Sequence, residues 1–301
     1  MYELIIIGAG PAGITAAVYA ARKKMNFLVI TQDIGGQAAW SGDIENYTGY
    51  QFVTGPELVS KFEEHMRKYS IDTREGEETI DLEKAGDVIR VKTSKAVYEA
   101  KAVIIASGKV SRELGVPGEK EYKNKGLTYC ATCDGPLFAG KDVAVIGGGN
   151  SALDAALQLM KIARRVYIIN NTPKLGGDPV MREKVEAGPA VTVCNDSTVT
   201  AITGAKMVSG IRITRNGKAE SIPVEGIFIE IGLVPNSGFA RGLDKNQHGE
   251  IRINCKNETS LAGVFAAGDV TDVPEKQIII AAGEGSKAAL AAFKYISHLR
   301  N

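Results

Sequence analysis

Two stretches of this chain share one order of features: an apolar strand, a glycine-rich turn, a helix and a second strand. In the first stretch, residues 4–7 lead into Gly8-Ala9-Gly10-Pro11-Ala12-Gly13. In the second, residues 143–146 lead into Gly147-Gly148-Gly149-Asn150-Ser151-Ala152. Such a turn lets backbone amides approach a pyrophosphate, and the helix that follows points its N-terminus at the anion. Because each turn joins a strand to a helix, the sequence predicts two dinucleotide-binding folds, with a ligand-free turn as the alternative for each.

The two folds are interleaved in the chain. Each is followed by a β-rich stretch that ends in an apolar strand and a glycine, at residues 102–108 and 226–232. Another apolar strand, at residues 263–269, follows the second fold, and we expect it to return to the first. The predicted fold is α/β, with two Rossmann-like, three-layer (ββα) domains, the second inserted into the first. The expected boundaries are 1–112 and 241–301 for the first domain and 113–240 for the second.

The C-terminal segment belongs to the first domain in this scheme. Residues 277–299 are expected to begin as an apolar strand and to continue as an alanine-rich helix. The glutamine at its start, Gln277, follows Gly268-Asp269 by eight residues.

Charge and composition restrict the partners of the chain. The sequence has 36 Lys+Arg against 35 Asp+Glu, so the net charge is +1, without the positive surplus that binds nucleic acid. The longest apolar runs, residues 16–21 and 278–282, are far shorter than the ~20 residues that cross a bilayer. The N-terminus lacks the basic flank and cleavage site of a signal peptide. We therefore expect a cytoplasmic protein with neither a nucleic-acid nor a membrane partner.

Four cysteines are present, and only Cys130 and Cys133 are close in sequence. The other two, Cys194 and Cys255, are expected to be inert core residues. A structural zinc site needs four ligands at fixed spacing, and the three histidines are scattered, so no metal site is expected.

The segment Cys130-Ala131-Thr132-Cys133-Asp134-Gly135-Pro136 carries the most chemistry. Beside nucleotide-binding folds, a Cys-x-x-Cys pair indicates a dithiol that cycles between thiols and a disulfide. The two-residue spacing allows a neighbouring helix terminus to lower the pKa of one thiol, and Asp134 is expected to hold or deliver a proton when that thiolate forms. The alternative is a pair of buried, reduced cysteines beside a solvated aspartate.

Together these residues resemble the low-molecular-weight thioredoxin reductase family, the class II flavoprotein disulfide reductases, and still more the flavoprotein core of alkyl hydroperoxide reductase. The resemblance covers essentially all 301 residues. Beyond the segments above, it rests on Gly35-Gly36-Gln37, Asp43-Ile44-Glu45-Asn46-Tyr47, Gly232-Leu233-Val234-Pro235-Asn236 and Gly268-Asp269 with Gln277. It implies a homodimeric, FAD-dependent thioredoxin-disulfide reductase. The chain begins at the flavin fold, without the N-terminal relay domain of the peroxide reductase, so thioredoxin or a glutaredoxin-like dithiol protein is the expected acceptor.

The resemblance also implies roles for single residues. Cys133 would face the flavin, Cys130 would attack the substrate disulfide, and Asp134 would be the acid. The glycines of the first turn would meet the FAD pyrophosphate, Gln37 and Asn46 the flavin end, Asp269 the ribityl chain, and Gln277 with Ile278 the ring edge. The full implied FAD set is Gly8, Gly10, Pro11, Ala12, Gly13, Gly36, Gln37, Asn46, Gly108, Gly268, Asp269, Gln277 and Ile278.

The electron donor is where this chain departs from the family pattern. Relatives that use NADPH carry arginines after the second strand of the inserted domain, because guanidinium groups grip the 2′-phosphate. The corresponding residues here are Asn170, Asn171, Thr172 and Gly176, none of them cationic. NADH is therefore favoured over NADPH, with Gly147, Gly149, Asn150, Ser151, Ala152 and Asn170 as its expected site. Three alternatives stay open: ferredoxin or a deazaflavin as donor beside a vestigial nucleotide site, a ferredoxin–NADP reductase-like flavoprotein, and a non-enzymatic redox sensor.

Overall fold

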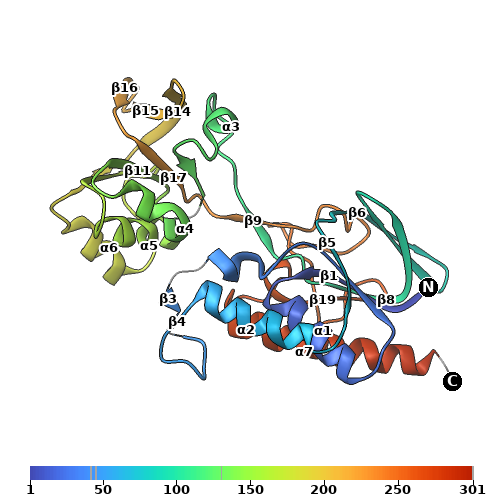
Figure 1. Ribbon diagram of the computed structural model, residues 1–301. Coiled ribbons are helices and arrows are strands. Elements are labelled where there is room, and N and C mark those ends of the chain that lie inside the picture. The colour runs from blue at the N-terminus through green and yellow to red at the C-terminus, as the bar shows by residue number, and fades with distance from the viewer. Residues whose placement is uncertain (41–42, 45, 130, 300–301) are drawn as a thin grey trace. The chain divides into compact units, whose positions relative to one another are not determined.

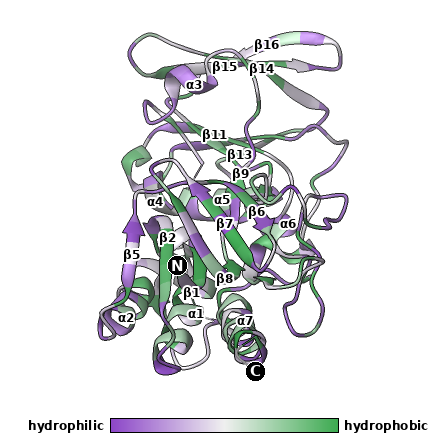
Figure 2. Cartoon of the chain, turned by 90° about the vertical axis from the view of Figure 1, so that its right-hand side faces the viewer, coloured by the Kyte–Doolittle hydropathy of each residue, from purple (hydrophilic) through white to green (hydrophobic). Residues whose placement is uncertain are grey.

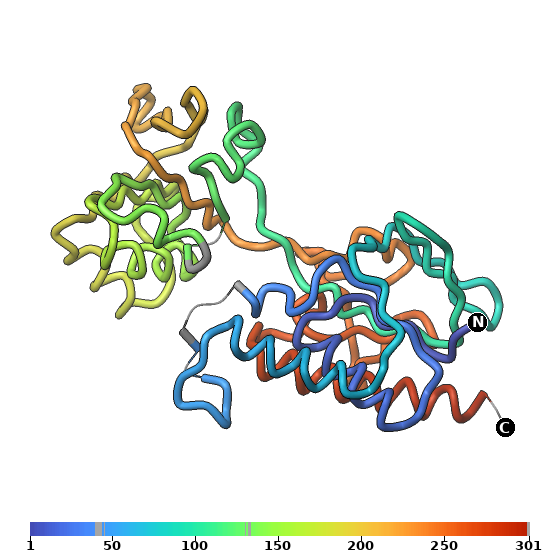
Figure 3. Tube along the Cα trace, viewed as in Figure 1, coloured from blue at the N-terminus to red at the C-terminus, as the bar shows by residue number. Residues whose placement is uncertain are grey.

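The chain forms two compact units in a computed structural model. The structure describes residues 1–40, 43–44, 46–129 and 131–299, and at positions 40, 43, 132 and 133 it describes the backbone alone. Unit 1 consists of Met1–Val110 and Val234–Asn301, and unit 2 consists of Ser111–Leu233. Figure 3 shows the blue N-terminal part and the red C-terminal part of the chain together in unit 1, and the green to yellow middle in unit 2.

The chain passes between the units through β9 (Lys109–Ser111) and β18 (Leu233–Pro235), two strands that pair with each other. Both passages come earlier than the expected residues 112 and 240. The second differs more, because Phe239, Ala240 and Leu243 are buried against the sheet of unit 1. Residues 234–240 therefore belong to unit 1 and not to the inserted unit.

Unit 1 is built on a sheet whose strands follow the order β5-β2-β1-β8-β7-β6, with β19 paired to the end of β8. The strands are β1 (Tyr2–Ala9), β2 (Phe27–Ile34), β5 (Asp72–Glu75), β6 (Thr79–Ala85), β7 (Val88–Thr93), β8 (Val97–Ile105) and β19 (Val264–Ala266). Strands β5, β2, β1, β8 and β19 run parallel, whereas β6 and β7 continue the sheet in antiparallel fashion. A two-stranded ribbon, β3 (Asp43–Ile44) and β4 (Val53–Thr54), lies outside this sheet.

Three helices, α1 (Pro11–Arg22), α2 (Gly55–Arg67) and α7 (Ile278–His298), lie along one face of this sheet (Figures 1 and 2). The 3-10 turns η1 (Gly36–Trp40) and η3 (Gly268–Val270) follow β2 and β19. The apolar strand expected at the start of the last segment is absent, because α7 is helical from Ile278 and packs its small residues against α1. In the described part of the chain, every helix is too short or too polar to span a lipid bilayer.

Strand β1 shows why this sheet needs layers on both faces. Its side chains alternate, so Leu4 and Ile6 pack with α1 and α7, whereas Ile5 and Ile7 pack on the opposite face with the segment near Phe239. All four are buried. Full burial of such a side chain contributes roughly 1.5–3 kcal/mol, so the apolar run directly before the first glycine turn fixes that turn at the edge of the sheet.

Unit 2 repeats the parallel pattern on a smaller scale. Its five-stranded parallel sheet has the order β10-β17-β11-β12-β13, and a three-stranded antiparallel sheet, β14-β15-β16, covers one face (Figure 1). The strands are β10 (Leu127–Thr128), β11 (Asp142–Ile146), β12 (Arg165–Ile169), β13 (Val191–Cys194), β14 (Ser197–Gly204), β15 (Val208–Arg215), β16 (Lys218–Ile222) and β17 (Gly226–Ile229). The helical segments are α3 (Glu119–Tyr122), α4 (Ala131–Asp134), η2 (Gly135–Phe138), α5 (Asn150–Leu159) and α6 (Pro179–Glu186).

Candidate active site

The first glycine turn joins β1 to α1, and its three glycines do three different things. Gly8 has φ +100°, and a Cβ there would overlap the carbonyl oxygen of Ala106. A Cβ on Gly13 would overlap the carbonyl oxygen of Gly8, so the start of α1 lies directly against the turn. A Cβ on Gly10, by contrast, would meet only the Gly35 oxygen, at 3.9 Å. The turn is therefore closed on the protein side and open at Gly10, where an anion can approach the backbone.

The expected flavin-end residues come from three distant segments of unit 1. The Nδ2 of Asn46 donates to Oε1 of Gln277 at 3.0 Å, and Gln277 is the N-cap residue of α7, directly before Ile278. The Nε2 of Gln37 donates to the carbonyl oxygen of Lys109 at 2.8 Å, which ties η1 to β9. Gly36 lies against Gly10, and Gly108 lies in an open stretch before β9. The structure thus groups the predicted residues around the N-terminal ends of α1 and α7.

Asp269, in η3, carries a partly buried carboxyl group. Burial raises its pKa, and the ammonium groups of Lys276 and Lys109 oppose that rise. Among the described residues, no side-chain hydrogen bond is formed by this carboxyl group, whereas Gly268 beside it packs against Ala12 and Ala281. A partly buried carboxyl group of this kind can accept hydrogen bonds from the hydroxyl groups of a ligand.

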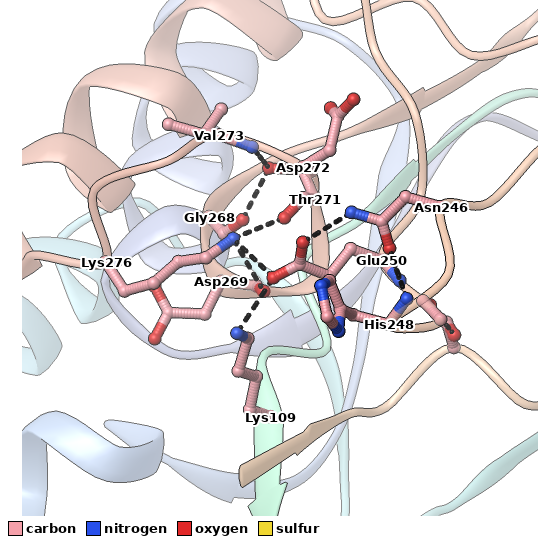
Figure 4. A network of polar contacts seen from close by, with 12 residues as sticks. Lys109, Asn246, His248, Glu250, Gly268, Asp269, Thr271, Asp272, Val273 and Lys276 are labelled. Atoms are coloured by element: carbon pink, nitrogen blue, oxygen red, sulfur yellow. Dashed lines mark hydrogen bonds and ion pairs between the residues drawn. The ribbon is translucent and has the colours of Figure 1, made fainter. Parts of the chain in front are cut away.

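The two lysines near Asp269 converge on Glu250 (Figure 4). The Nζ atoms of Lys109 and Lys276 lie 2.9 Å and 3.0 Å from Oε1 of Glu250, and Asn246 donates to its Oε2 at 2.7 Å. Burial alone would raise the pKa of Glu250, but these hydrogen bonds hold it at about 2. The network connects β9 to the segment before α7, and no sequence pattern predicted it because its members are far apart in the chain.

These residues fit an FAD. An open glycine turn at a helix N-terminus suits the pyrophosphate, and an unpartnered carboxyl group at Asp269 suits the hydroxyl groups of a ribityl chain. The Asn46–Gln277 pair has amide donors and acceptors of the kind that meet a heteroaromatic ring edge. The group itself would supply two-electron redox chemistry.

In unit 2, the carboxyl ends of four neighbouring parallel strands lie at one edge of the sheet. Strand β10 leads into the dithiol segment, β17 into Glu230, β11 into Gly147 and β12 into Asn170. Ligands of open α/β sheets bind at this edge. The topology thus brings the dithiol segment and the second glycine turn to the same side of unit 2.

The second glycine turn resembles the first in its geometry. Gly147 has φ +133°, and a Cβ there would overlap the carbonyl oxygen of Glu230. Gly149 has no atom within 4 Å of the place that a Cβ would take, so this position is open. Asn150 begins α5 and accepts from the backbone N–H of Asp178 at 2.7 Å, while Ser151 is exposed and Ala152 is buried.

The side chain of Asn170, which was expected to contact the ribose, forms hydrogen bonds within unit 2. The side chain is 2% exposed and packs on Gly148. Its Nδ2 donates to the Thr172 oxygen at 3.0 Å and to Asn195 Oδ1 at 2.8 Å, and its Oδ1 accepts from Thr172 Oγ1 at 2.9 Å. Because both ends of the amide are satisfied, Asn170 shapes this turn and offers a ribose no free donor. The ribose contact of Asn170 stays a prediction, and it would require the amide to exchange one of these internal hydrogen bonds.

The dithiol segment is described in part. Cys130 lies outside the described residues, and for Cys133, in α4, the structure describes the backbone alone. Asp134 ends α4, and its Oδ2 accepts a hydrogen bond from the hydroxyl of Thr128, at the end of β10. This bond ties the predicted acid to the end of β10. Of the other cysteines, Cys194 is buried, but Cys255 is exposed, because it lies in a turn held by the Asn254 side chain.

Glu230 is a second carboxyl group near this segment, and it was not among the predicted site residues. Burial, helped by Asp154, raises its pKa to about 8. The backbone N–H of Ala131, at the start of α4, favours the charged form of its carboxyl group and so limits this rise in pKa. An acidic residue inside the apolar run Ile229-Glu230-Ile231 is the signal that could have identified it.

Comparison with known proteins identifies the family. The family model described as pyridine nucleotide-disulphide oxidoreductase matches residues 2–285. The chain belongs to this family. The pyridine nucleotide-disulphide oxidoreductases are FAD-dependent enzymes that use a pyridine nucleotide, in keeping with the two nucleotide-binding folds.

Three similar proteins place the chain within the family. A solved thioredoxin reductase of Lactococcus lactis (FR conformation) superposes with a TM-score of 0.89 at 34% identity, covering 99% of this chain and 100% of that one. The NADH dehydrogenase of Ferdinandcohnia aciditolerans is 42% identical over 98% of this chain and 57% of its own length. One alkyl hydroperoxide reductase subunit, from Staphylococcus epidermidis, is 42% identical over 98% of this chain and 59% of its own length. The resemblance to the thioredoxin reductases and to alkyl hydroperoxide reductase is confirmed. The chain spans less than two thirds of the length of the NADH dehydrogenase and of the alkyl hydroperoxide reductase subunit.

Proposed function

We propose that this chain transfers two electrons from a reduced donor through FAD to the Cys130–Cys133 disulfide and then to thioredoxin or a glutaredoxin-like dithiol protein. The topology of unit 2 supports this most: strands β10 and β11, which lead into the dithiol segment and the second glycine turn, both pair with β17 and end at the same edge of the sheet. In such surroundings a Cys-x-x-Cys pair serves redox exchange.

The proposed roles follow from the contacts of each residue. Gly8, Gly10 and Gly13 bind the FAD pyrophosphate with the N-terminus of α1, and Asp269 accepts hydrogen bonds from ribityl hydroxyls. Reduction of one disulfide to two thiols takes up two electrons and two protons. The hydrogen bond from Thr128 fixes the position of Asp134, whose carboxyl group stores or delivers one of these protons. The remaining members of the FAD set keep the roles that the resemblance implies.

NADH is the proposed donor. No cation stands at positions 170, 171, 172 or 176 to bind a 2′-phosphate, and a 42% identical relative is named NADH dehydrogenase. We propose that Gly147, Gly149 and Asn150 to Ala152 bind its pyrophosphate, with Asn170 shaping the turn. Ferredoxin or a deazaflavin is the second candidate donor, favoured by the internal bonding of Asn170, which leaves the ribose without its expected partner.

The donor test is anaerobic addition of NADH, NADPH or reduced ferredoxin while the flavin absorbance is followed. We expect NADH to bleach the flavin at a lower concentration than NADPH. Bleaching by reduced ferredoxin, with neither nucleotide effective, would replace NADH by the second candidate.

The dithiol test is the variant Cys130→Ser. It should abolish reduction of thioredoxin, because it removes the sulfur that is proposed to attack the acceptor disulfide, while the flavin stays reducible by the donor. Cys255→Ser, at the exposed cysteine outside the proposed site, is the matched control and should keep full turnover. Undiminished thioredoxin reduction by Cys130→Ser would refute the dithiol relay.

A homodimer and a cytoplasmic location complete the proposal. Both rest on the family resemblance and on the reducing compartment in which a disulfide reductase works. Light scattering of the purified protein, with the mass of two chains as the expected result, tests the oligomeric state.

A further inference from the structure

Glu119 forms a buried junction near the start of unit 2. Glu119 is only 2% exposed, and its carboxylate accepts three hydrogen bonds. The backbone N–H groups of Leu114 and Gly115 donate to it at 2.8 Å and 2.6 Å, and the Tyr129 hydroxyl donates at 2.8 Å. A buried carboxylate is tolerated only when it is satisfied in this way. One side chain therefore joins the segment after β9 to the residue that precedes Cys130.

Tyr129 is held as a hydrogen-bond donor. Burial and the bond to Glu119 raise the pKa of its hydroxyl, so the proton stays on the oxygen. The Nζ of Lys123 lies 5.2 Å from the centre of its ring. Both contacts restrict the side chain at the point where the chain leaves the sheet, since β10 ends at Thr128.

The dithiol segment is thus bracketed by two side-chain anchors. On its N-terminal side, Tyr129 is bound to Glu119, and on its C-terminal side, Asp134 is bound to Thr128. The second anchor holds the predicted acid. Neither Glu119 nor Tyr129 has a role in the proposed relay.

We propose that Glu119 and Tyr129 are positioning residues that hold the dithiol segment in the geometry of its disulfide. The inference rests on the proposed function, because it assigns a redox role to the same cysteine pair. A disulfide requires specific distances and torsions, so an anchor that limits the motion of one cysteine raises the effective concentration of one thiol at the other. Without the anchor, disulfide formation becomes less favourable and the reduction potential of the pair becomes less negative.

The test is a thiol–disulfide equilibrium of the flavin-containing protein with glutathione. In this exchange the Cys130–Cys133 disulfide is reduced to two thiols while two glutathione thiols are oxidised to glutathione disulfide, with two electrons and two protons transferred. After acid quenching and alkylation, mass spectrometry counts the free thiols. For Tyr129→Phe, which removes the anchoring hydroxyl, we expect a roughly tenfold lower constant for disulfide formation, about 30 mV in potential.

The chain offers a matched control in unit 1. There the Tyr98 hydroxyl binds the buried carboxylate of Glu77, at 3.1 Å and 3.2 Å from its two oxygens. Tyr98→Phe should lower thermal stability much as Tyr129→Phe does and leave the dithiol equilibrium unchanged. Glu119→Gln should shift the equilibrium in the same direction as Tyr129→Phe, and the double variant should add little to the shift of Glu119→Gln.

Each outcome decides the inference. An equilibrium constant for Tyr129→Phe within twofold of the parent would overturn it. An equal shift of the equilibrium constant in Tyr98→Phe would also overturn it. If Glu119→Gln fails to fold, the comparison of Tyr129→Phe with Tyr98→Phe is sufficient to decide. If Cys130 and Cys133 of the parent never form a disulfide, the proposed function fails instead.

Discussion

At the end of β17, Glu230 has a carboxyl group whose pKa burial raises to about 8, against 4.5 for an ordinary glutamate. Between these values the folded protein holds a proton that the unfolded chain releases. The contribution of Glu230 to stability is therefore fully present below pH 4.5 and is lost as pH rises through 8. The slope is at most about 1.4 kcal/mol per pH unit.

Glu230→Gln tests this titration. The variant cannot ionise, so we expect its unfolding free energy to exceed that of the parent increasingly from pH 5 to pH 8, as measured by urea unfolding. Glu225→Gln, at an exposed glutamate five residues earlier, should follow the parent. A constant difference between Glu230→Gln and the parent over this range would contradict the raised pKa.

At the scale of residues, local signals were predictable and distant partners were not. The spacing of Gly8, Gly10 and Gly13 indicates a nucleotide turn because the mechanism lies within one turn. The partners of Glu250 and Glu119 come from other segments, and no local pattern in the sequence records such a pairing. Asn170 illustrates the same limit, since its position predicts a ribose contact and its hydrogen bonds to Thr172 and Asn195 satisfy the amide.

Among the elements, α1 and α7 pack unusually closely. A Cβ on Gly285 would overlap the backbone of Ala12, one residue before the third glycine of the first turn. Gly285→Ala should therefore force the helices apart, lower the unfolding free energy by about 1–3 kcal/mol and weaken FAD retention. Thermal unfolding and the flavin content after dialysis measure both effects.

Gly283→Ala is the matched control, since a Cβ on Gly283 in the same helix would meet no atom within 4 Å. We expect it to be neutral or stabilising by up to ~1 kcal/mol. Equal behaviour of the two variants would contradict the close packing.

The Lys109–Glu250–Lys276 network joins β9 to the segment before α7, so its loss should lower the unfolding free energy of unit 1. Because the folded pKa of Glu250, about 2, lies below its ordinary value, its stabilisation is present above pH 4.5 and is lost as pH falls towards 2. Glu250→Gln should cost roughly 2 kcal/mol in unfolding free energy at pH 7, where both lysines lose a buried anion.

The pH dependence of that loss is the measurement. The difference between Glu250→Gln and the parent should shrink between pH 4.5 and pH 2, whereas Glu275→Gln, at an exposed neighbour of Lys276, should stay close to the parent throughout. A difference that persists at pH 2 would mean that the charge of Glu250 is not its source.

The elements themselves follow from apolar runs that end in glycine. Strands β1, β11 and β17 and the helices after the two turns lie where the sequence predicts them, with ends that differ by a few residues. The start of α7 differs, because a run of three isoleucines favours a strand locally while packing against α1 favours a helix.

For the whole molecule, the insertion of one nucleotide fold into the other could be expected from the late strand at residues 263–269. In the structure β19 pairs with β8 and closes the sheet of unit 1. The exact boundaries, after residues 110 and 233, depend on whether residues such as Phe239 pack into the core of unit 1 or of unit 2. Only the packing of the folded chain determines this.

The proposed function as a whole depends on electrons passing between bound FAD and the pair Cys130 and Cys133. Anaerobic titration of the FAD-containing protein with dithionite counts the electrons that each flavin-containing molecule accepts. Two reduce the flavin, and two more reduce the disulfide if it forms. We expect four electrons per FAD for the parent and two for a variant with both Cys130→Ser and Cys133→Ser. Two electrons for the parent and the variant alike would contradict the relay.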